Sequence, residues 1–388
     1  MSDRLRVLTV FGTRPEAIKM APVVMELGRH AEEIDSRVVV TAQHREMLDG
    51  VLNHFSLVPD YDLDVMRERQ SLSETAIRVL GGLQPIFQTE QPDLVLVHGD
   101  TLTTGIASLA AFFCRLRVGH VEAGLRTGNK WAPFPEEVMR KVADSVCDLH
   151  FCPTEVSREN LSREGIAGPG VYVTGNTAID ALLWTVHRDT TPRAQEREKM
   201  ILVDVHRRES FGAPLERVAR ALVDIAEGYE DVRLVVSVHP NPAVKDLLHK
   251  HLSGTVRVRL LTPQSYVEWA RLMQCSFLII TDSGGLQEEA PALGVPVLLT
   301  REETERPEAV AAGTVQLVGT DPVRIANAVR RLVACKTAYQ SMACARNPYG
   351  DGAAARRTVE GILHHFGRRN DPPTPWIAMD EGGENLCP

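Results

Sequence analysis

The sequence predicts an α/β protein built from two doubly wound domains, each with a parallel sheet. Twelve short apolar runs rich in β-branched residues alternate with longer amphipathic stretches, and the runs fall into two sets of six on either side of a polar segment. Runs that are apolar at nearly every position are typical of strands buried on both faces of a parallel sheet, with helices between them. A length of 388 residues also suits two domains better than one.

The expected strands follow one another in chain order. They are residues 7–11, 38–42, 94–98, 118–122, 150–152 and 171–174 in the first half, and 200–205, 234–238, 256–261, 277–281, 295–299 and 314–318 in the second. Between the halves, near 177–199, the polar segment HRDTTPRAQEREK contains Pro192 and has no apolar face to bury, so we interpret it as the connection between the domains. A closed eight-strand barrel, the alternative architecture, would require about eight repeats without such a break.

Composition and charge exclude several classes of protein. With 43 basic and 51 acidic side chains the formal net charge is −8, so a broad basic surface for nucleic acid or anionic lipid is not expected. No stretch approaches the roughly 18 consecutive apolar residues of a membrane span, and the N-terminal apolar run does not resemble a secretory signal. Seven scattered cysteines without a CxxC pair are typical of buried thiols in a reducing compartment. We therefore expect a cytoplasmic protein.

Chemically active residues follow the ends of several expected strands. Arg14 and Lys19 come after the first strand, Asp100 after the third, and His206 after the seventh. The tenth strand leads into Asp282-Ser283-Gly284-Gly285, where two glycines let a ligand approach a helix N-terminus that favours phosphate. Because ligands of open α/β sheets bind beyond the carboxyl ends of the strands, we expect these side chains at the sheet edge that carries the site.

Each of these segments also has a structural interpretation. The glycine pair opens an ordinary strand-to-helix turn in many proteins, and Arg14 with Lys19 has the composition of a solvated basic pair. Glu289, one helical turn after the glycines, is placed to accept hydrogen bonds from a ribose diol. The motifs GxGxxG, GxxxxGK[ST] and YxxxK are absent, so nicotinamide-dependent epimerases and P-loop enzymes lose their main sequence support.

Three carboxylates are candidates for acid–base chemistry. Asp100 and Glu122 end successive buried strands, where burial can raise a carboxyl pKa toward the range of a useful proton carrier. Glu136 follows Pro135, and Arg140 lies four positions further along the same helix face. The alternatives are a surface ion pair for Glu136 and Arg140, a turn or helix cap for Asp100, and a structural polar residue for His206.

Ordered motifs along nearly the whole chain resemble the non-hydrolysing UDP-N-acetylglucosamine 2-epimerases. They are FGTRPEAIKMAP (11–22), TAQH (41–44), HGDT (98–101), HVEAGLRT (120–127), PFPEE (133–137), VTGNTAIDAL (173–182), HRRES (206–210), DSGGLQEEAPALGVPVL (282–298), TERPEA (304–309) and NPYGDG (347–352). The resemblance implies two Rossmann-like domains facing across a cleft (the GT-B arrangement), a homodimer, and no nicotinamide or metal cofactor. It also implies that a C-terminal helix at about 354–370 crosses back to the first domain, so we expect residues 1–176 with this helix to form one domain and 177–353 the other. Residues 371–388 contain prolines, glycines and like charges, and we expect them to be a flexible tail.

The same resemblance implies a reaction and the residues that perform it. UDP-N-acetylglucosamine and UDP-N-acetylmannosamine interconvert by anti elimination of UDP to 2-acetamidoglucal and re-addition. The implied catalytic residues are Asp100, Glu122, Glu136 and His206; the implied substrate-binding residues are Arg14, Lys19, Arg140, Ser283, Gly284, Gly285, Glu289 and Arg301. A second, activating UDP-N-acetylglucosamine is implied at Gln43, His44, Glu46, Arg69, Arg207 and His239.

The chain departs from the resembled pattern at three places. Glu46 stands where activator-dependent members carry glutamine, and its carboxylate would repel a diphosphate unless paired. Met139 replaces an asparagine, and Asp204-Val205 replace a small residue followed by glycine or alanine.

Three other functions remain open at this level. The hydrolysing relatives share the motifs but release free N-acetylmannosamine and UDP. A GT-B glycosyltransferase uses a similar glycine-rich nucleotide site but requires an acceptor, and a nucleotide-sugar sensor would bind without catalysis.

Overall fold

The computed structural model describes residues 4–41, 45–67, 70–189, 198–207 and 210–378. Contacts divide the chain into two units: unit 1 contains the residues up to Ala181 together with Tyr349–Ile377, and unit 2 contains Leu182–Pro348. Within the described residues no helix combines the length and the apolar character needed to cross a membrane.

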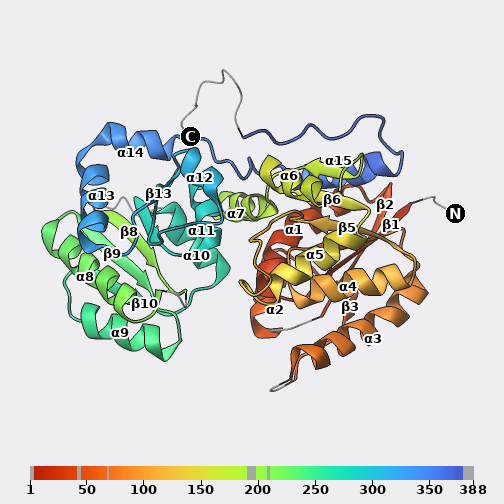
Figure 1. The fold of residues 1–388 in the computed structure, drawn as a ribbon, viewed down its shortest axis with the longest axis horizontal. Helices are drawn as coiled ribbons and strands as arrows, with labels where there is room; N and C mark the ends of the chain where they lie inside the picture. The colour runs from red at the N-terminus through yellow and green to blue at the C-terminus, as the bar shows by residue number, and fades with distance from the viewer. Residues whose placement is uncertain (1–3, 42–44, 68–69, 190–197, 208–209, 379–388) are drawn as a thin grey trace. The chain divides into compact units, whose positions relative to one another are not determined.

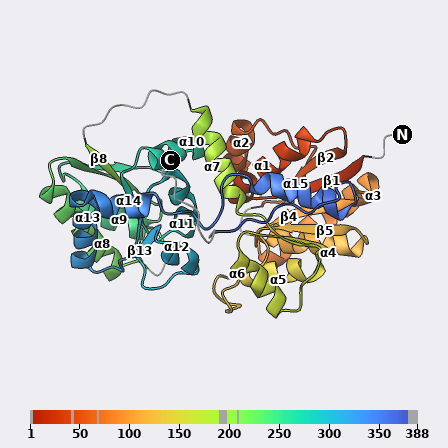
Figure 2. The same ribbon diagram turned by 90° about the horizontal axis from the view of Figure 1, so that it is seen from above.

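Unit 1 is a seven-stranded parallel sheet with the strand order β3-β2-β1-β4-β5-β6-β7. The strands are β1 (Leu5–Phe11), β2 (Ile34–Val40), β3 (Tyr61–Asp62), β4 (Leu94–His98), β5 (Arg117–Val121), β6 (Leu149–Cys152) and β7 (Val171–Val173). The helices are α1 (Arg14–Arg29), α2 (Arg45–His54), α3 (Leu72–Glu90), α4 (Leu102–Phe113), α5 (Glu136–Val146), α6 (Glu155–Arg163), α15 (Ala354–His365) and the first part of α7 (Thr177–Arg188). Helix α4 packs between α3 and α5, and α1 packs against α2 and α15, so both faces of the sheet are covered (Figures 1 and 2).

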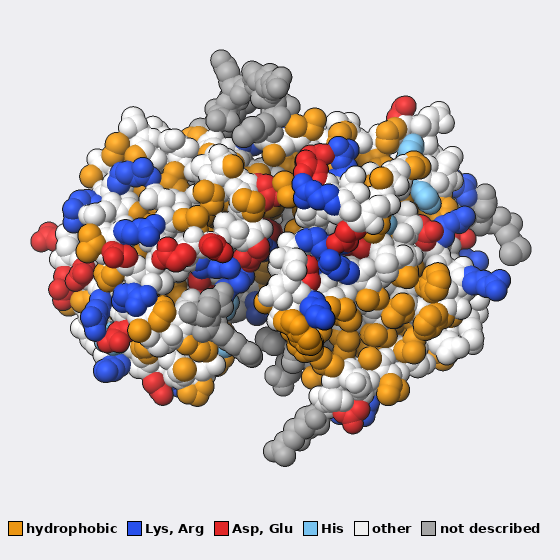
Figure 3. All heavy atoms as spheres, viewed as in Figure 1, with side chains coloured by type: hydrophobic (Ala, Val, Ile, Leu, Met, Phe, Trp, Pro, Cys, Tyr) orange, Lys and Arg blue, Asp and Glu red, His pale blue; other side chains and the backbone are white. Residues whose placement is uncertain are grey.

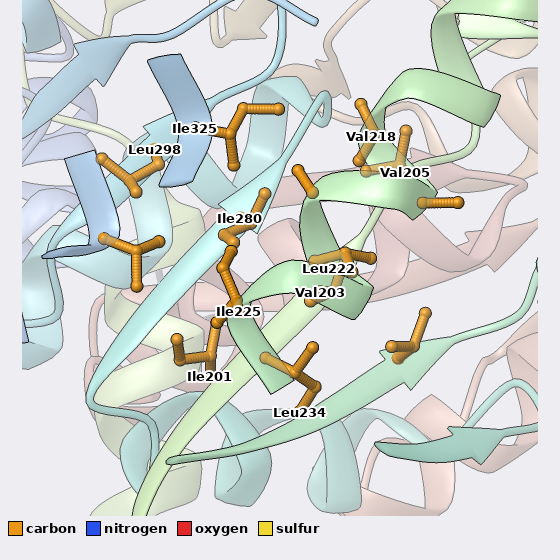
Figure 4. Packing of buried hydrophobic residues seen from close by; sticks show 14 of the residues in the cluster. Ile201, Val203, Val205, Val218, Leu222, Ile225, Leu234, Ile280, Leu298 and Ile325 are labelled. Carbon is orange, nitrogen blue, oxygen red and sulfur yellow. The ribbon is translucent and has the colours of Figure 1, made fainter. Parts of the chain in front are cut away.

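Unit 2 is a six-stranded parallel sheet with the order β10-β9-β8-β11-β12-β13. Its strands are β8 (Lys199–Asp204), β9 (Val232–Ser237), β10 (Val258–Leu261), β11 (Leu278–Thr281), β12 (Val297–Leu299) and β13 (Val315–Leu317). Its helices are α8 (Ala213–Gly228), α9 (Pro242–Leu252), α10 (Tyr266–Gln274), α11 (Gly284–Glu289), the 3₁₀ helix η2 (Ala290–Leu293), α12 (Pro307–Ala311), α13 (Pro322–Ala334) and α14 (Lys336–Ala343). Figure 4 shows the core, where Ile201 and Val203 of β8 meet Leu222 of α8 and Ile325 of α13.

The predicted fold class is confirmed by these two all-parallel sheets. Each of the twelve predicted strands overlaps an observed one, because strands buried on both faces are continuous apolar runs. Strand β3 was not predicted, since it is a two-residue edge strand whose residues are only partly buried.

The end of the chain differs from expectation. Trp376 is 7% exposed, its backbone N–H donates to the carbonyl of Val173 at 2.8 Å, and it packs against Cys152 and Leu161. The prediction of a flexible tail from residue 371 is therefore wrong as far as Trp376, because this indole completes a small apolar cluster of unit 1. Residues 379–388 lie outside the described part of the chain.

The cysteines are also less uniform than predicted. Cys152 is a buried thiol, but Cys275 and Cys335 are exposed, and Cys344 is disulfide-bonded. The expectation of buried thiols throughout is thus wrong at these positions.

Candidate active site

In unit 1 the predicted site residues follow β1, β4 and β5, which are neighbours in the sheet. Helix α1 begins at Arg14 after Thr13, which forms a capping box with Glu16. The buried carboxylate of Glu16 accepts the N–H groups of Gly12 and Thr13 at 3.0 and 2.8 Å and the hydroxyl of Thr101 at 2.6 Å. Burial raises the pKa of Glu16, the hydrogen bonds opposing it. This carboxyl group ties the turn after β1 to the turn after β4.

Glu122 lies directly after β5 with φ of 67°, a left-handed conformation that is unfavourable for a non-glycine residue and is concentrated at functional sites. Its side chain, 9% exposed, forms an ion pair with Lys19 and accepts a hydrogen bond from Nδ2 of Asn176 at 3.1 Å. Nε2 of His98 lies 3.8 Å from the same carboxylate, and burial lowers the pKa of His98 to about 3, so this ring is neutral. Glu122 is therefore held by the Lys19 cation, by Asn176 and by the neutral ring of His98.

Asp100 forms an ion pair with Arg140 of α5, and Arg140 also contacts Glu137 at 3.1 Å. Glu137 is buried and accepts the backbone N–H groups of residues 127–128 at 3.1 and 3.0 Å, which fixes the loop before α5. The interpretation of Glu136 and Arg140 as a surface pair is wrong, since Arg140 is buried and bound to Asp100 and Glu137. Oε2 of Glu136 is buried and has no hydrogen-bond partner among the described residues.

A series of buried polar side chains from β5 and α5 holds the turn after β4. His120 lies 2.6 Å from Asp144 through Nδ1 and 2.7 Å from the carbonyl of Gly99 through Nε2. Arg126 lies 2.8 Å from the other carboxylate oxygen of Asp144. Burial raises the pKa of Asp144, but His120 and Arg126 outweigh it and lower the value to about 2. The backbone carbonyl just before Asp100 is thereby fixed.

In unit 2 the predicted residue His206 follows β8, and Asp282 follows the adjacent strand β11. Asp282 is fully buried and accepts the N–H groups of His206 and Arg207, each at 3.0 Å, and the hydroxyl of Ser210 at 2.7 Å. This one carboxylate therefore determines the course of the loop that carries His206.

The glycine-rich turn after β11 has the predicted open surface. Ser283 precedes α11 and makes no capping hydrogen bond through its side chain, and Gly285 is exposed with no atom near its missing Cβ position. A Cβ atom at Gly284 would lie 2.6 Å from Nη1 of Arg306. Glycine at this position thus allows an arginine to lie against the backbone of the turn, and Glu289 ends the same short helix.

Three arginines surround one carboxylate beside this turn. Arg207, Arg301 and Arg306 lie 2.9, 2.6 and 2.8 Å from the carboxylate of Glu305. Burial raises the pKa of Glu305, but the arginines, Arg306 first, outweigh it and lower the value to about 2. The predicted anion-binding residue Arg301 is therefore part of a cationic cluster that was not foreseen as a whole.

The residues predicted for an activating ligand are only partly placed. Gln43, His44 and Arg69 lie outside the described residues, and Glu46 falls within α2. Arg207 belongs to the arginine cluster, and the ring of His239 stacks on that of His206 with centroids 5.8 Å apart.

Two of the departures from the resembled pattern, Met139 and Asp204-Val205, can be placed among their contacts. Met139 packs against α4, where its Sδ would lie 2.7 Å from a Cβ atom at Gly105. Val205 is buried in the core of unit 2. Asp204 lies beside His206, with Oδ2 3.2 Å from Nδ1.

Several residues have roles at the two sites that were not predicted, among them Asn176, Glu137 and Asp282. Asn176 follows β7 and donates a hydrogen bond to Glu122. Its position shortly after a predicted strand is the signal that could have identified it. The carboxylates of Glu137 and Asp282 fix loops by accepting hydrogen bonds from backbone N–H groups. No sequence pattern indicates which loop a given carboxylate will bind.

The chain is similar to proteins of known function. The family model for UDP-N-acetylglucosamine 2-epimerase matches residues 26–363. The chain is 50% identical over 373 residues to the UDP-N-acetylglucosamine 2-epimerase of Bacillus subtilis, covering 95% of this chain and 98% of that protein. It is 52% identical over 375 residues to the enzyme of that name from Escherichia coli K12, covering 93% and 99%. The crystal structure of UDP-GlcNAc 2-epimerase from Neisseria meningitidis bound to UDP-GlcNAc matches with a TM-score of 0.85 at 46% identity, covering 93% and 100%.

Proposed function

Since the chain belongs to the UDP-N-acetylglucosamine 2-epimerase family, we propose that it interconverts UDP-N-acetylglucosamine and UDP-N-acetylmannosamine without hydrolysis and without a nicotinamide cofactor. The observation that carries this proposal is the set of carboxylates in unit 1. Asp100 and Glu122 follow adjacent strands, each paired with a cation, and α5, whose Arg140 binds Asp100, begins with Glu136.

The chemistry requires acid–base groups and a stabilised leaving group. A carboxylate removes the proton from C2 of the sugar, the C1–O bond breaks, and its electron pair leaves with the UDP oxygen. The product is 2-acetamidoglucal. In the return step C2 is protonated on the opposite face and the UDP oxygen attacks C1.

We assign the acid–base role to Asp100, Glu122 and Glu136. The buried Oε2 of Glu136 supports this assignment, because a carboxylate oxygen without a partner among the described residues is available to a substrate proton. Lys19, Arg14 and Arg140 are assigned to the diphosphate, whose negative charge grows as the bond to C1 breaks.

We assign the nucleotide to unit 2. Ser283, Gly284 and Gly285 offer a turn with little side-chain bulk, His206 and Arg301 supply donors, and Glu289 is assigned to the ribose hydroxyls. The binding of UDP-GlcNAc by the Neisseria meningitidis relative supports the choice of ligand.

Incubation of the protein with UDP-N-acetylglucosamine alone in D₂O tests the proposal. The expected product is the manno epimer carrying deuterium at C2, identified by NMR. Accumulation of free N-acetylmannosamine and UDP would instead assign the hydrolysing reaction. Turnover that appears only when a sugar acceptor is added would assign a glycosyltransferase.

A second UDP-N-acetylglucosamine as activator remains a proposal that rests on the resemblance. Arg207 and His239 lie next to His206 in unit 2, which supports the existence of a neighbouring anion site. A sigmoidal dependence of rate on UDP-N-acetylglucosamine that becomes hyperbolic in the Arg207→Ala variant would support it.

A further inference from the structure

The carboxylate of Asp204 is placed to control the imidazole of His206. Its Oδ2 lies 3.2 Å from Nδ1 of the ring, and its side chain is 15% exposed against 35% for His206. The Asp204 backbone is fixed, because its carbonyl accepts the hydroxyl of Thr281 at 2.7 Å and the N–H of Asp282 at 3.3 Å. The carboxylate of this ion pair is thus carried by the hydrogen-bonded end of β8.

The other charged and titratable groups around His206 come from three further segments. Oδ1 of Asp282, after β11, lies 3.9 Å from Nδ1. Arg207 is the next residue in the loop, and the His239 ring, after β9, stacks at 5.8 Å with an interplanar angle of 12°. Nδ1 of His239 accepts a hydrogen bond from the backbone N–H of Asn241 at 3.1 Å.

These groups act on the charge of the ring in opposite directions. Asp204 raises the pKa of His206 through the side-chain interaction, burial lowers it, Asp282 raises it, and Arg207 lowers it, with a net rise. Asp282 accepts hydrogen bonds from the N–H groups of the loop, and its oxygen is farther from Nδ1 of His206. Asp204 is therefore the carboxylate within hydrogen-bond distance of the ring.

We propose that Asp204 is a positioning residue: its carboxylate holds Nδ1 of His206, favours the cationic imidazole, and leaves Nε2–H as the donor to the substrate diphosphate. The role rests on the proposed function, since it presumes that His206 contacts the nucleotide sugar. A cationic donor stabilises the negative charge of departing UDP better than a neutral one, and a ring held through Nδ1 cannot present the wrong nitrogen.

Titration of the imidazole signals by NMR tests the ion pair without substrate. The pKa of His206 in Asp204→Asn should fall relative to the unmodified protein, since the amide keeps the shape but not the charge. His206→Gln assigns the resonance. Asp224→Asn, at an exposed position on α8, serves as the matched control and should leave the His206 pKa unchanged. An unchanged pKa in Asp204→Asn overturns the proposal whatever the reaction proves to be.

The pH dependence of kcat tests the consequence. With Asp204→Asn the rate relative to that of the unmodified enzyme should fall as the pH rises, by about 10-fold near about pH 8, because the ring loses its proton at a lower pH in the variant. Asp204→Glu restores a carboxylate and should recover part of the loss. A loss that is equal at every pH, with no recovery in Asp204→Glu, would assign Asp204 a purely structural role and overturn the proposal.

Discussion

At the residue scale, the candidate site depends on carboxylates paired with the cations that we assign to the diphosphate. Lys19 binds Glu122 and Arg140 binds Asp100 in the described structure. An arriving diphosphate therefore competes for the same cations.

Replacing Glu122 by glutamine tests the catalytic assignment. The amide keeps the size and an acceptor oxygen for Asn176 but cannot take up a proton, so we expect kcat to fall by about 10²-fold or more. Coupled detection of UDP-N-acetylmannosamine measures the rate. Asp100→Asn and Glu136→Gln should behave likewise.

The control for these variants is Glu159→Gln, at an exposed position on α6. It should retain full activity, and circular dichroism should show all variants folded. Activity within twofold of the unmodified enzyme in any one of the three site variants would remove that residue from the catalytic set.

The candidate residues that could be predicted are those directly after buried strands. Asp100, Glu122 and His206 were found in this way, since the carboxyl ends of parallel strands share one edge. The partners of these residues could not be predicted. Whether Arg140 binds Glu136 or Glu137 depends on which side of α5 faces Asp100. That orientation is set by tertiary packing and not by the local sequence.

At the element scale, helix α15 returns the end of the chain to unit 1 and is capped by a residue distant in sequence. Asp180 of α7 accepts the N–H groups of Ala354 and Ala355 at 3.2 and 2.8 Å. Burial, opposed by these bonds, raises the pKa of Asp180 to about 7. A carboxyl group with a raised pKa in the folded state contributes stability at low pH, and that contribution is lost as the pH rises from about 4 to about 7.

Asp180→Asn tests this pH dependence. The amide does not titrate, so the melting temperature of the unmodified protein should fall relative to that of the variant as the pH rises from about 4 to about 7, and the difference should then stay constant. Calorimetry across this range measures it. A difference that does not change with pH would contradict the raised pKa.

The packing of the extended segment after α15 against unit 1 can also be tested. Trp376 is buried, and Arg357 lies 5.5 Å from its ring centroid, so Trp376→Ala should lower the free energy of unfolding by about 3 kcal/mol. Urea denaturation measures this change. The neighbouring Ile377→Ala removes a side chain that is 52% exposed and should change the stability little. Equal effects of the two variants would contradict docking of this segment.

The sequence could not show that this segment packs. Its prolines and polar residues are typical of a mobile tail, and a single tryptophan has no periodicity. The twelve predicted strands, by contrast, were predictable because each is an apolar run of three to seven residues.

At the scale of the whole molecule, unit 1 exposes apolar side chains that a monomer does not require. Phe112 and Phe113 end α4 and are 55% and 65% exposed, and Leu72 and Ile77 lie on α3, which packs against α4. Figure 3 shows hydrophobic side chains gathered over the part of unit 1 where Figure 1 draws these two helices. Contiguous apolar surface of this kind is typical of protein interfaces.

We therefore predict that the homodimer implied by the family resemblance forms through this surface. Light scattering should give twice the chain mass of 42.8 kDa, and Phe113→Glu should give a monomer, because burying an unpaired carboxylate in an apolar interface is unfavourable. Val256→Glu changes an equally exposed apolar residue of unit 2 and should leave the dimer intact. A monomeric unmodified protein would contradict the predicted dimer. A dimer that survives Phe113→Glu and dissociates in Val256→Glu would show that the interface lies elsewhere.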